Sequence, residues 1–218
     1  MNSLSEHLSK IRTDYVLASL EEESTGDDPI VFFEKWFAEA EAAAVTEVNA
    51  MSLATADENG MPKVRIVLLK GIEAQNFVFY TNYKSHKGKD IAANNRVALL
   101  FFWKELQRQV RIEGIIEKVA PSISDAYFQS RPYESKIGAN ASPQSAIIES
   151  RLVLEKNIKA LIQKYPNGSF VPRPINWGGY NVSPTKIEFW QGRASRLHDR
   201  IVFEKTTDHN WKKYRIAP

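Results

Sequence analysis

The sequence has no cysteine and no long hydrophobic run. Without thiols, the chain cannot form a disulfide, a thiolate nucleophile or a cysteine-ligated metal site. The longest uninterrupted apolar run, Val97 to Trp103, is far shorter than the ~20 residues that a membrane-spanning helix needs. No apolar signal core is present in the opening segment MNSLSEHLSKIRTDY. We therefore expect no membrane association, no secretion by that route and a cytoplasmic location.

Several common functional motifs are also missing. The sequence contains no Walker loop, no dinucleotide-binding GxGxxG and no HExxH zinc motif. Its four histidines show no metal-ligand spacing, so we expect no metal site. Hydrophobic residues make up 43% and charged residues 25% of the 218 residues, which excludes a mainly disordered chain and allows a sizeable core.

Charge is unevenly distributed along the chain. Residues 1–50 hold three Lys/Arg against eleven Asp/Glu, whereas the rest hold 26 against 15. A basic body favours an anionic partner such as phosphate groups, nucleic acid or acidic lipid. A basic surface kept for solubility explains the same composition.

The chain is expected to begin with a mobile polar arm, residues 1–27, followed by one domain over residues 28–218. Asp28 and Pro29 form a helix start, with Asp28 as N-cap and Pro29 in the first turn. The next residues repeat apolar side chains at helical spacing, which indicates a helix with a broad buried face.

From residue 49 the pattern changes to strands. Strands are predicted at 49–56, 63–71, 76–81, 96–103 and 108–119, with a hairpin turn at Asn59-Gly60 and a short helix at 85–95. A further helix is predicted at 121–130, one or two more are predicted over 143–165, and strands are predicted at 180–182, 186–191, 198–205 and 211–216. Strands joined by short turns predict a mostly β, α+β fold with an antiparallel barrel or sandwich.

Two cationic segments suit phosphate binding. Lys63 to Lys70 places cations in a hydrophobic strand, where the planar fork of Arg65 can hold a phosphate. An edge strand with solvent-facing charges explains this pattern equally well. Arg65 and Lys70 point to opposite faces of a regular strand, so both serve one site only if a bulge or a strand end lies before Lys70. Ser85 caps a helix whose first turn carries Lys87, an unfavourable place for a cation unless an anion binds nearby.

Two further groups of side chains share a face. Tyr127 and Arg131 lie one helical turn apart, with Ser135 after them, and could form a second phosphate pocket or merely satisfy the helix end. In an extended segment Arg196, His198 and Arg200 lie on one strand face, where three potential cations favour an anionic or electron-rich neighbour.

These segments resemble the pyridoxine/pyridoxamine 5′-phosphate oxidase family over nearly the whole chain. The resemblance is carried by Arg65 to Lys70, Phe79 to Asn82, Gln109 to Arg111, Ser130 to Pro132, Gln144-Ser145, Trp177 to Gly179 and, above all, Glu188 to Gln191 followed by Arg196 to Arg200.

The resemblance implies an FMN-binding split β-barrel with flanking helices that works as a homodimer, with FMN at the subunit interface. It implies oxidation of pyridoxine 5′-phosphate and pyridoxamine 5′-phosphate to pyridoxal 5′-phosphate, with O2 reduced to H2O2, in vitamin B6 cofactor synthesis or salvage.

The resemblance also implies site residues. The FMN-binding residues would be Arg65, Ile66, Val67, Leu68, Leu69, Lys70, Tyr80, Thr81, His86, Lys87, Gln109, Gln144, Ser145, Trp190 and Arg200. The substrate-binding residues would be Arg12, Tyr15, Lys70, Tyr127, Arg131, Ser135, Arg196, Leu197 and His198, with Arg196 and His198 catalytic. His86 stands where the family commonly has a phosphate-binding Arg, and Arg193 stands where Gly is frequent.

Two other functions fit parts of the pattern. A split-barrel flavin reductase or a non-catalytic FMN carrier would share Arg65 and Lys87 but would need no second phosphate pocket. A nucleic-acid-binding barrel would use the basic body and aromatic side chains. Because the resemblance accounts for both cationic clusters, we expect no nucleic-acid partner.

Overall fold

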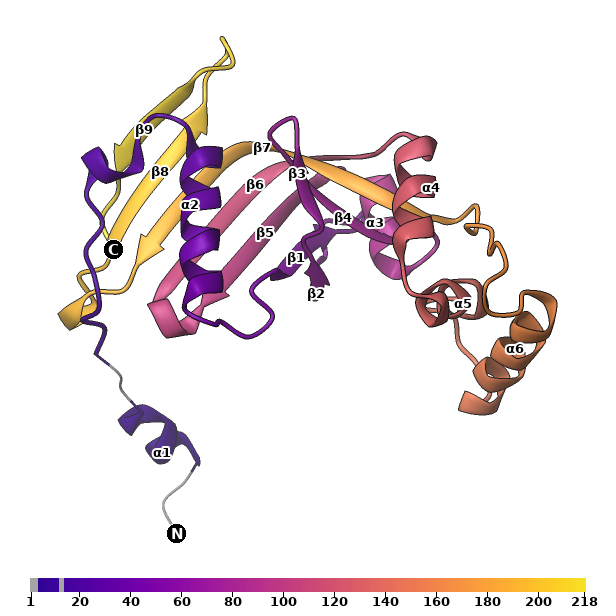
Figure 1. The fold of residues 1–218 in the computed structure, drawn as a ribbon. Coiled ribbons are helices and arrows are strands. Elements are labelled where there is room, and N and C mark those ends of the chain that lie inside the picture. The colour runs from indigo at the N-terminus through magenta and orange to yellow at the C-terminus, as the bar shows by residue number, and fades with distance from the viewer. Residues whose placement is uncertain (1–3, 12–13) are drawn as a thin grey trace. The chain divides into compact units, whose positions relative to one another are not determined.

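Alternating apolar residues build most of this molecule as antiparallel strands. The computed structural model describes residues 4–11 and 14–218, and over these it has nine strands and six α-helices (Figure 1). The strands are β1 Ala50–Ala56, β2 Pro62–Leu68, β3 Gly71–Glu73, β4 Asn76–Asn82, β5 Arg96–Trp103, β6 Arg108–Lys118, β7 Trp177–Gln191, β8 Asp199–Lys205 and β9 Trp211–Arg215. The helices are α1 Leu4–Lys10, α2 Pro29–Ala42, α3 His86–Ala93, α4 Pro121–Ser130, α5 Tyr133–Ala141 and α6 Arg151–Lys164.

The strands form one sheet in the order β2-β1-β5-β6-β7-β4-β3, and β8 pairs with both β7 and β9. The pairs β1–β2, β3–β4, β4–β7, β7–β8 and β8–β9 are antiparallel. The predicted α+β class with antiparallel strands is confirmed. Among the described residues, no helix is both long enough and apolar enough to cross a bilayer.

The chain divides into two units, each assembled from separated segments. Unit 1 comprises residues 1–48, 100–112 and 185–218, and unit 2 comprises residues 49–99 and 113–184. The expectation of a mobile arm over residues 1–27 and one domain over residues 28–218 stays a prediction.

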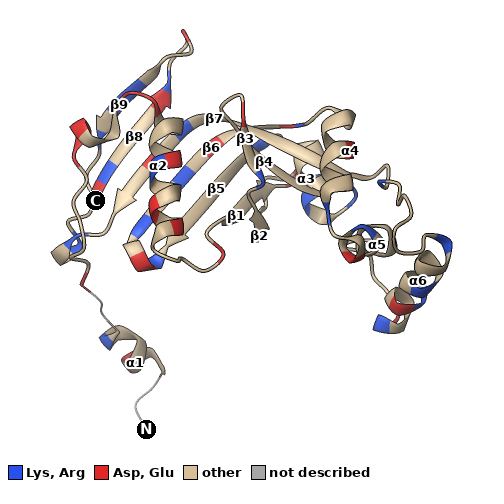
Figure 2. Cartoon of the chain, viewed as in Figure 1, with Lys and Arg blue, Asp and Glu red and all other residues tan. Residues whose placement is uncertain are grey.

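The core of unit 1 is aromatic. The N-cap is confirmed, because Oδ1 of Asp28 accepts hydrogen bonds from the backbone N–H of Ile30 and Val31 at 2.8 and 3.4 Å, and α2 begins there. The apolar face of α2 packs on the strands, with ring centroids 4.7 Å apart for Phe32 and Phe189 and 5.1 Å for Phe33 and Phe101. Figure 2 shows that several residues of the same helix are acidic.

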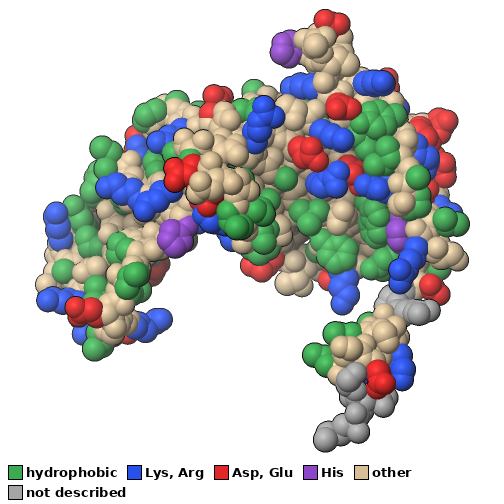
Figure 3. All heavy atoms as spheres, turned by 180° about the vertical axis from the view of Figure 1, so that it is seen from behind, with side chains coloured by type: hydrophobic (Ala, Val, Ile, Leu, Met, Phe, Trp, Pro, Cys, Tyr) green, Lys and Arg blue, Asp and Glu red, His purple; other side chains and the backbone are tan. Residues whose placement is uncertain are grey.

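Unit 2 has a smaller helical core beside its strands. Phe128, Ile137, Val171 and Trp177 form a buried cluster that joins α4, α5 and the start of β7. Helices α5 and α6 pack on each other. The space-filling view in Figure 3 shows hydrophobic side chains scattered among charged ones on the visible surface. Scattered exposed hydrophobic residues are normal for a folded protein.

Two sequence predictions were wrong in this part of the chain. Residues 143–150 are not helical, and the positive φ of 70° at Ser145 is incompatible with a helix there. A helix forms instead at 133–141, where burial of Ile137 and Ala141 overrides the weak helix propensity of Gly138 and Asn140. The predicted strands at 180–182 and 186–191 are parts of one strand, β7, which continues through Pro184.

Glycines let two tyrosines approach the β7 backbone. A Cβ on Gly178 would lie 2.1 Å from the hydroxyl oxygen of Tyr83, and one on Gly179 would lie 2.8 Å from the ring of Tyr80. Real Cβ atoms essentially never come so close to other heavy atoms, so a larger residue at either position would displace a tyrosine side chain.

Candidate functional site

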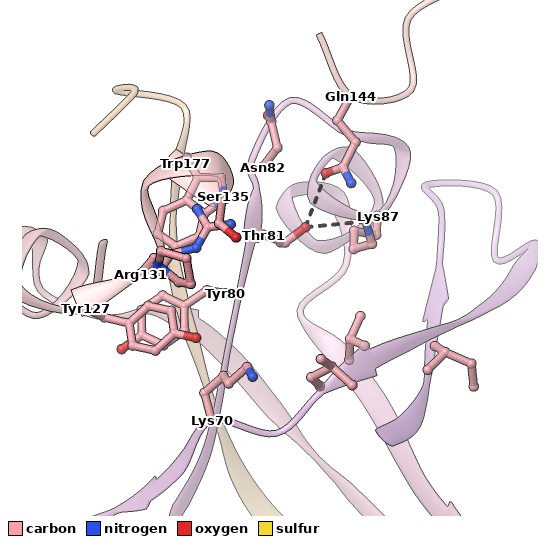
Figure 4. Close-up of a pocket in the computed structure, with 14 residues that line it drawn as sticks. Lys70, Tyr80, Thr81, Asn82, Lys87, Tyr127, Arg131, Ser135, Gln144 and Trp177 are labelled. Carbon is pink, nitrogen blue, oxygen red and sulfur yellow. Dashed lines mark hydrogen bonds between the residues drawn. The ribbon is translucent and has the colours of Figure 1, made fainter. Parts of the chain in front are cut away.

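A cavity of about 490 Å³ lies within unit 2 (Figure 4). Its lining residues come from β2 and its end, β4, α3, α4, α5, the 142–150 segment and the start of β7. The lining includes eleven residues predicted from the sequence, Ile66, Val67, Leu68, Lys70, Tyr80, Thr81, Lys87, Tyr127, Arg131, Ser135 and Gln144. It also includes Asn82, Pro132 and Trp177, to which the sequence analysis gave no role.

One wall of the cavity is an aromatic stack. The rings of Tyr80 and Tyr127 are parallel with centroids 3.7 Å apart, and Trp177 stacks on Tyr80 at 5.6 Å. Burial, followed by the charge of Glu73, raises the pKa of Tyr80 to about 12. Burial also raises the pKa of Tyr127. Both phenols therefore stay protonated at neutral pH and can donate hydrogen bonds.

Arg131 holds an unused donor at this wall. Its guanidinium carbon lies 4.6 Å from the Trp177 ring centroid, and its Nη1 is buried with no hydrogen-bond partner among the described residues. Burial lowers the pKa of this guanidinium, although arginine remains charged. Leaving a buried donor unpaired costs about 1–3 kcal/mol, so the arrangement favours an anionic ligand. Figure 4 shows Arg131 beside Trp177, with Ser135, Tyr127 and Lys70 lining the same cavity.

A second polar group lies elsewhere in the cavity, at the start of α3. Nζ of Lys87 donates to Oγ1 of Thr81 at 3.3 Å, and that hydroxyl donates to Oε1 of Gln144 at 3.4 Å. Burial lowers the pKa of Lys87, and the nearby Arg65 lowers it further. Ser85 caps α3 as predicted, accepting from the backbone N–H of Gly88 at 3.4 Å. His86 is exposed in the first helical turn and is not part of the cavity lining.

The structure places Arg65 outside the lining of this cavity. Its Nη1 donates to Oγ1 of Thr55 at 2.7 Å, and its Nη2 lies 3.5 Å from a carboxylate oxygen of Asp90. Burial raises the pKa of Asp90, but hydrogen bonds from Lys63 and Thr55 outweigh this effect and hold it below its usual value. Strand β2 ends at Leu68, before Lys70, which is one of the two geometries that the sequence analysis required. Leu69 is buried and Ser145 is exposed, and neither lines the cavity.

Unit 1 has a separate cavity of about 740 Å³, lined by Ile11, Asp14, Tyr15, Arg193, Ser195, Arg196 and His198. The Tyr15 ring lies 5.7 Å from Trp190 and 5.9 Å from His198, centroid to centroid. Arg12 lies outside the described residues, and Leu197 is exposed. Here the structure brings together three residues predicted from sequence, Tyr15, Arg196 and His198.

The predicted strand face of Arg196, His198 and Arg200 was wrong. Strand β8 starts only at Asp199, because residues 192–198 form the connection from β7 and contain a 3-10 turn at Ala194–Arg196. Positive φ angles of 55° at Ser195 and 63° at Arg196 reverse the backbone there. The three side chains therefore do not share a strand face, although Arg196 and His198 line one cavity.

The backbone N–H of Arg193 donates to Nδ1 of His198 at 3.0 Å. Because Nδ1 accepts, the neutral imidazole carries its proton on Nε2. This contact has no local signal in the sequence, because it depends on the reversed backbone.

Arg200 binds a buried acid to which the sequence analysis gave no role. Its Nε and Nη2 donate to the two carboxylate oxygens of Glu188 at 2.8 and 3.0 Å, and Nη2 of Arg111 lies 2.9 Å from the same carboxylate. Glu188 belongs to the segment Glu188 to Gln191 that carries the family resemblance. An acidic residue at a buried strand position is the feature of the sequence that could have identified it. Gln109 is half-buried on β6. In the described part of the chain, no group of three or more His, Asp and Glu side chains is arranged to hold a metal ion.

Comparison with family models gives two matches. Residues 37–165 match the model of pyridoxamine 5′-phosphate oxidase, and residues 177–218 match the pyridoxine 5′-phosphate oxidase C-terminal dimerisation region. The second match supports a homodimer.

Curated relatives cover almost the whole chain. The chain is 56% identical to the pyridoxine/pyridoxamine 5′-phosphate oxidase of Leptospira interrogans, over 97% of this chain and 98% of that protein. It is 55% identical to the protein of that name from Cytophaga hutchinsonii, over 97% of this chain and 99% of that protein.

Two solved structures are similar in fold. PhzG from Burkholderia lata 383, in complex with tetrahydrophenazine-1-carboxylic acid, has a TM-score of 0.87 and 28% identity, covering 93% of this chain and 99% of that one. A pyridoxamine 5′-phosphate oxidase-related, FMN-binding protein from Nostoc punctiforme has a TM-score of 0.69 at 16% identity, covering 85% and 97%. These similarities confirm the split-barrel fold expected from the sequence.

Proposed function

Because the chain belongs to the pyridoxamine 5′-phosphate oxidase family, we propose that it oxidises pyridoxine 5′-phosphate and pyridoxamine 5′-phosphate to pyridoxal 5′-phosphate, with O2 as acceptor. FMN is its cofactor. The alcohol loses two electrons and two protons, which reduce O2 to H2O2. The amine additionally consumes water and releases ammonia.

The observation that carries the proposal is the unit 2 cavity with two separate cationic positions. FMN and the substrate each bring one phosphate. Lys87 with Thr81 and Gln144 suits one phosphate, and Arg131 with Tyr127, Ser135 and Lys70 suits the other. The strongest support for an anion-binding position is the Nη1 of Arg131, which is buried and has no hydrogen-bond partner among the described residues. A protein that only carried FMN would gain nothing from the second position.

The proposed FMN-binding residues remain those expected from the sequence, Arg65 to Lys70, Tyr80, Thr81, His86, Lys87, Gln109, Gln144, Ser145, Trp190 and Arg200. The proposed substrate residues are Arg12, Tyr15, Lys70, Tyr127, Arg131, Ser135, Arg196, Leu197 and His198. We propose that FMN lies at the interface of two protomers, consistent with the C-terminal dimerisation region.

When bound, FMN supplies the chemistry of accepting a hydride and passing two electrons to O2. The chain's own residues bind and orient the substrate. Arg131 and Lys70 hold its phosphate by charge, and the protonated phenol of Tyr127 donates a hydrogen bond. The stacked rings of Tyr80 and Trp177 form an apolar wall at this end of the cavity. His198, with its proton on Nε2, is a hydrogen-bond donor to the pyridine ring or its substituents, and Arg196 stabilises negative charge there.

The decisive experiment is oxygen consumption by the FMN-loaded protein with each phosphorylated vitamer, together with a peroxide assay. We expect turnover of one or both, and little turnover of unphosphorylated pyridoxine, because it cannot use Arg131. FMN-loaded protein that consumes no oxygen with either phosphorylated vitamer would overturn the proposal.

The similarity to PhzG supports a second candidate, oxidation of a reduced heterocyclic carboxylic acid. A carboxylate can replace a phosphate at Arg131, so the same assay should include such an acid. The identity of 56% to the Leptospira relative, against 28% to PhzG, favours the vitamin substrates. The cytoplasmic location and the role in vitamin B6 synthesis or salvage stay predictions.

A further inference from the structure

Asp199, the first residue of β8, joins the N-terminal segment, the 192–198 connection and β9 within unit 1. Its Oδ2 accepts from the backbone N–H of Leu20 at 3.0 Å and from Nη1 of Arg193 at 3.1 Å. Its Oδ1 accepts from Nη1 of Arg215 at 2.8 Å. The side chain is only 16% exposed, so solvent weakens these contacts less than at a fully exposed site.

Arg215 extends this network into the N-terminal segment. Its Nε and Nη2 donate to the two carboxylate oxygens of Glu22 at 2.7 and 2.6 Å, and Nη2 also donates to the carbonyl of Leu20 at 2.8 Å. Nζ of Lys213 donates to the carbonyls of Glu22 and Gly26 at 3.0 and 2.8 Å. Residues 20–26 are thereby held on β9 by charge-assisted hydrogen bonds, the stronger class of such bonds.

The same N-terminal segment carries Tyr15 to the unit 1 cavity. The backbone N–H groups of Val16 and Leu17 donate to Oε1 of Gln107 at 3.0 and 3.3 Å. A Cβ on Gly192 would lie 2.7 Å from the Tyr15 ring, so the segment packs directly on the backbone that leads into the 192–198 connection.

Asp199 also holds that connection from its other side. It binds Arg193, whose backbone N–H fixes the imidazole of His198. One carboxylate thus restrains both the segment that presents Tyr15 and the connection that presents His198.

We propose that Asp199 is a positioning residue. It fixes the position of the segment 14–20 relative to the 192–198 connection, so that Tyr15 and His198 face the substrate together. This inference rests on the proposed function. Loss of the hydrogen bonds to Asp199 lowers the fraction of molecules in which the segment 14–20 occupies its position beside His198. The apparent substrate affinity falls by that fraction, while turnover at saturation changes little.

The test compares Asp199→Asn with Asp208→Asn in the FMN-loaded enzyme. Both variants remove one negative charge, but Asp208 is exposed in the turn between β8 and β9. For Asp199→Asn we expect the KM for pyridoxine 5′-phosphate to rise about tenfold, with kcat and FMN affinity within about twofold of the wild type. Hydrogen–deuterium exchange over residues 14–20 should become faster. Asp208→Asn should leave all four quantities unchanged.

Three outcomes would overturn the proposal. The first is unchanged KM and exchange in Asp199→Asn, and the second is an equal effect of Asp208→Asn. The third is a parallel loss of FMN affinity and melting temperature, which would indicate a merely structural role.

If Asp199→Asn does not fold, a second variant tests the same network. Arg215→Met leaves the carboxylate of Asp199 in place and should speed hydrogen–deuterium exchange over residues 14–20. Unchanged exchange there would also refute the proposal. A wild-type protein without oxidase activity would refute the proposed function alone, since the exchange measurement does not depend on turnover.

Discussion

The guanidinium of Arg131 stacks over the ring of Trp177 at 4.6 Å while its Nη1 remains buried without a partner in the described part of the chain. A cation on the face of an indole gains roughly 0.5–2 kcal/mol and is fixed in orientation. The aromatic ring therefore holds the guanidinium ready for an anion that approaches from the cavity.

Replacing Arg131 should weaken substrate binding selectively. Arg131→Ala removes a charge-assisted hydrogen bond worth about 1.5–3 kcal/mol, so the KM for the phosphorylated substrate should rise roughly 10- to 150-fold. Arg131→Lys keeps the charge but loses the planar stack and should give an intermediate KM. Steady-state kinetics with a parallel FMN titration measures both effects.

Arg151→Ala is the matched control, because Arg151 lies on α6 with 87% of its side chain exposed and pairs only with Glu155 among the described residues. It should not change KM. If Arg131→Ala instead loses FMN and keeps normal substrate affinity, the two phosphate positions are reversed.

FMN affinity should depend on pH through Lys87. Burial, followed by Arg65, lowers the pKa of Lys87 in the free protein, and a phosphate beside Nζ favours the charged form and raises it again. Affinity should therefore be full below the lowered pKa and fall as the pH rises through it. Fluorescence titration of FMN across alkaline pH measures this dependence. In Lys87→Arg the decline should disappear, and a decline that persists there would assign it to another group.

Dilution should release FMN if the cofactor is shared by two protomers. Dissociation of the dimer would break the site, so dimerisation and flavin retention are linked by mass action. Analytical ultracentrifugation at the flavin and protein wavelengths, over a range of concentrations, follows both. A monomer that retains FMN at full affinity would contradict the shared site.

Acid should weaken the hold of Arg215 on the N-terminal segment. Hydrogen bonds from Arg215 lower the pKa of Glu22 to about 2 from 4.5. A depressed carboxyl pKa contributes stability that is present above pH 4.5 and is lost as the pH falls toward 2. Glu22→Gln should thus lower the urea midpoint at pH 6 and have a smaller effect at pH 2.5.

Glu23→Gln serves as its control, since no ion pair involves Glu23 in the part of the chain that the structure describes. A pH-independent effect of Glu22→Gln would show that its contacts act through packing and not through charge.

Arg196→Met should separate catalysis from folding. Arg196 is exposed and lines the unit 1 cavity, so removing its charge should leave the protein folded, yellow and dimeric. We expect kcat/KM to fall on the order of 10²-fold, the scale of a lost orienting contact. Anaerobic stopped-flow measurement of flavin reduction tests this. Normal reduction with normal substrate affinity would leave Arg196 without a catalytic role.

Local signals in the sequence predicted much of the fold. Asp28-Pro29 predicted the start of α2, and Asn59-Gly60 predicted the turn before β2, where Gly60 has a φ of 78°. The helix at 133–141 was missed because tertiary burial of Ile137 decides it and local propensity does not. The separate strands predicted at 180–182 and 186–191 were wrong, because β7 runs without a break from Trp177 to Gln191.

The candidate site was predicted partly from residue chemistry and mainly from the family resemblance. Residue spacing put Tyr127 and Arg131 on one helix face, and both line the unit 2 cavity. Trp177 was missed as a lining residue because its stacking on Arg131 joins segments that are distant in sequence. The prediction that Arg196 and Arg200 share a strand face was wrong because the backbone reverses at Ser195. A positive φ is rare in residues other than Gly and Asn, so the sequence did not indicate this reversal.

The interleaving of the two units has a consequence for synthesis on the ribosome. Helix α2 emerges early, but its Phe32 packs on Phe189, which belongs to a segment made near the end of translation. Phe33 can pack on Phe101 by mid-synthesis, but the contact of Phe32 with Phe189 forms only when the chain is almost complete. Unit 2, whose segments end at residue 184, can be completed first.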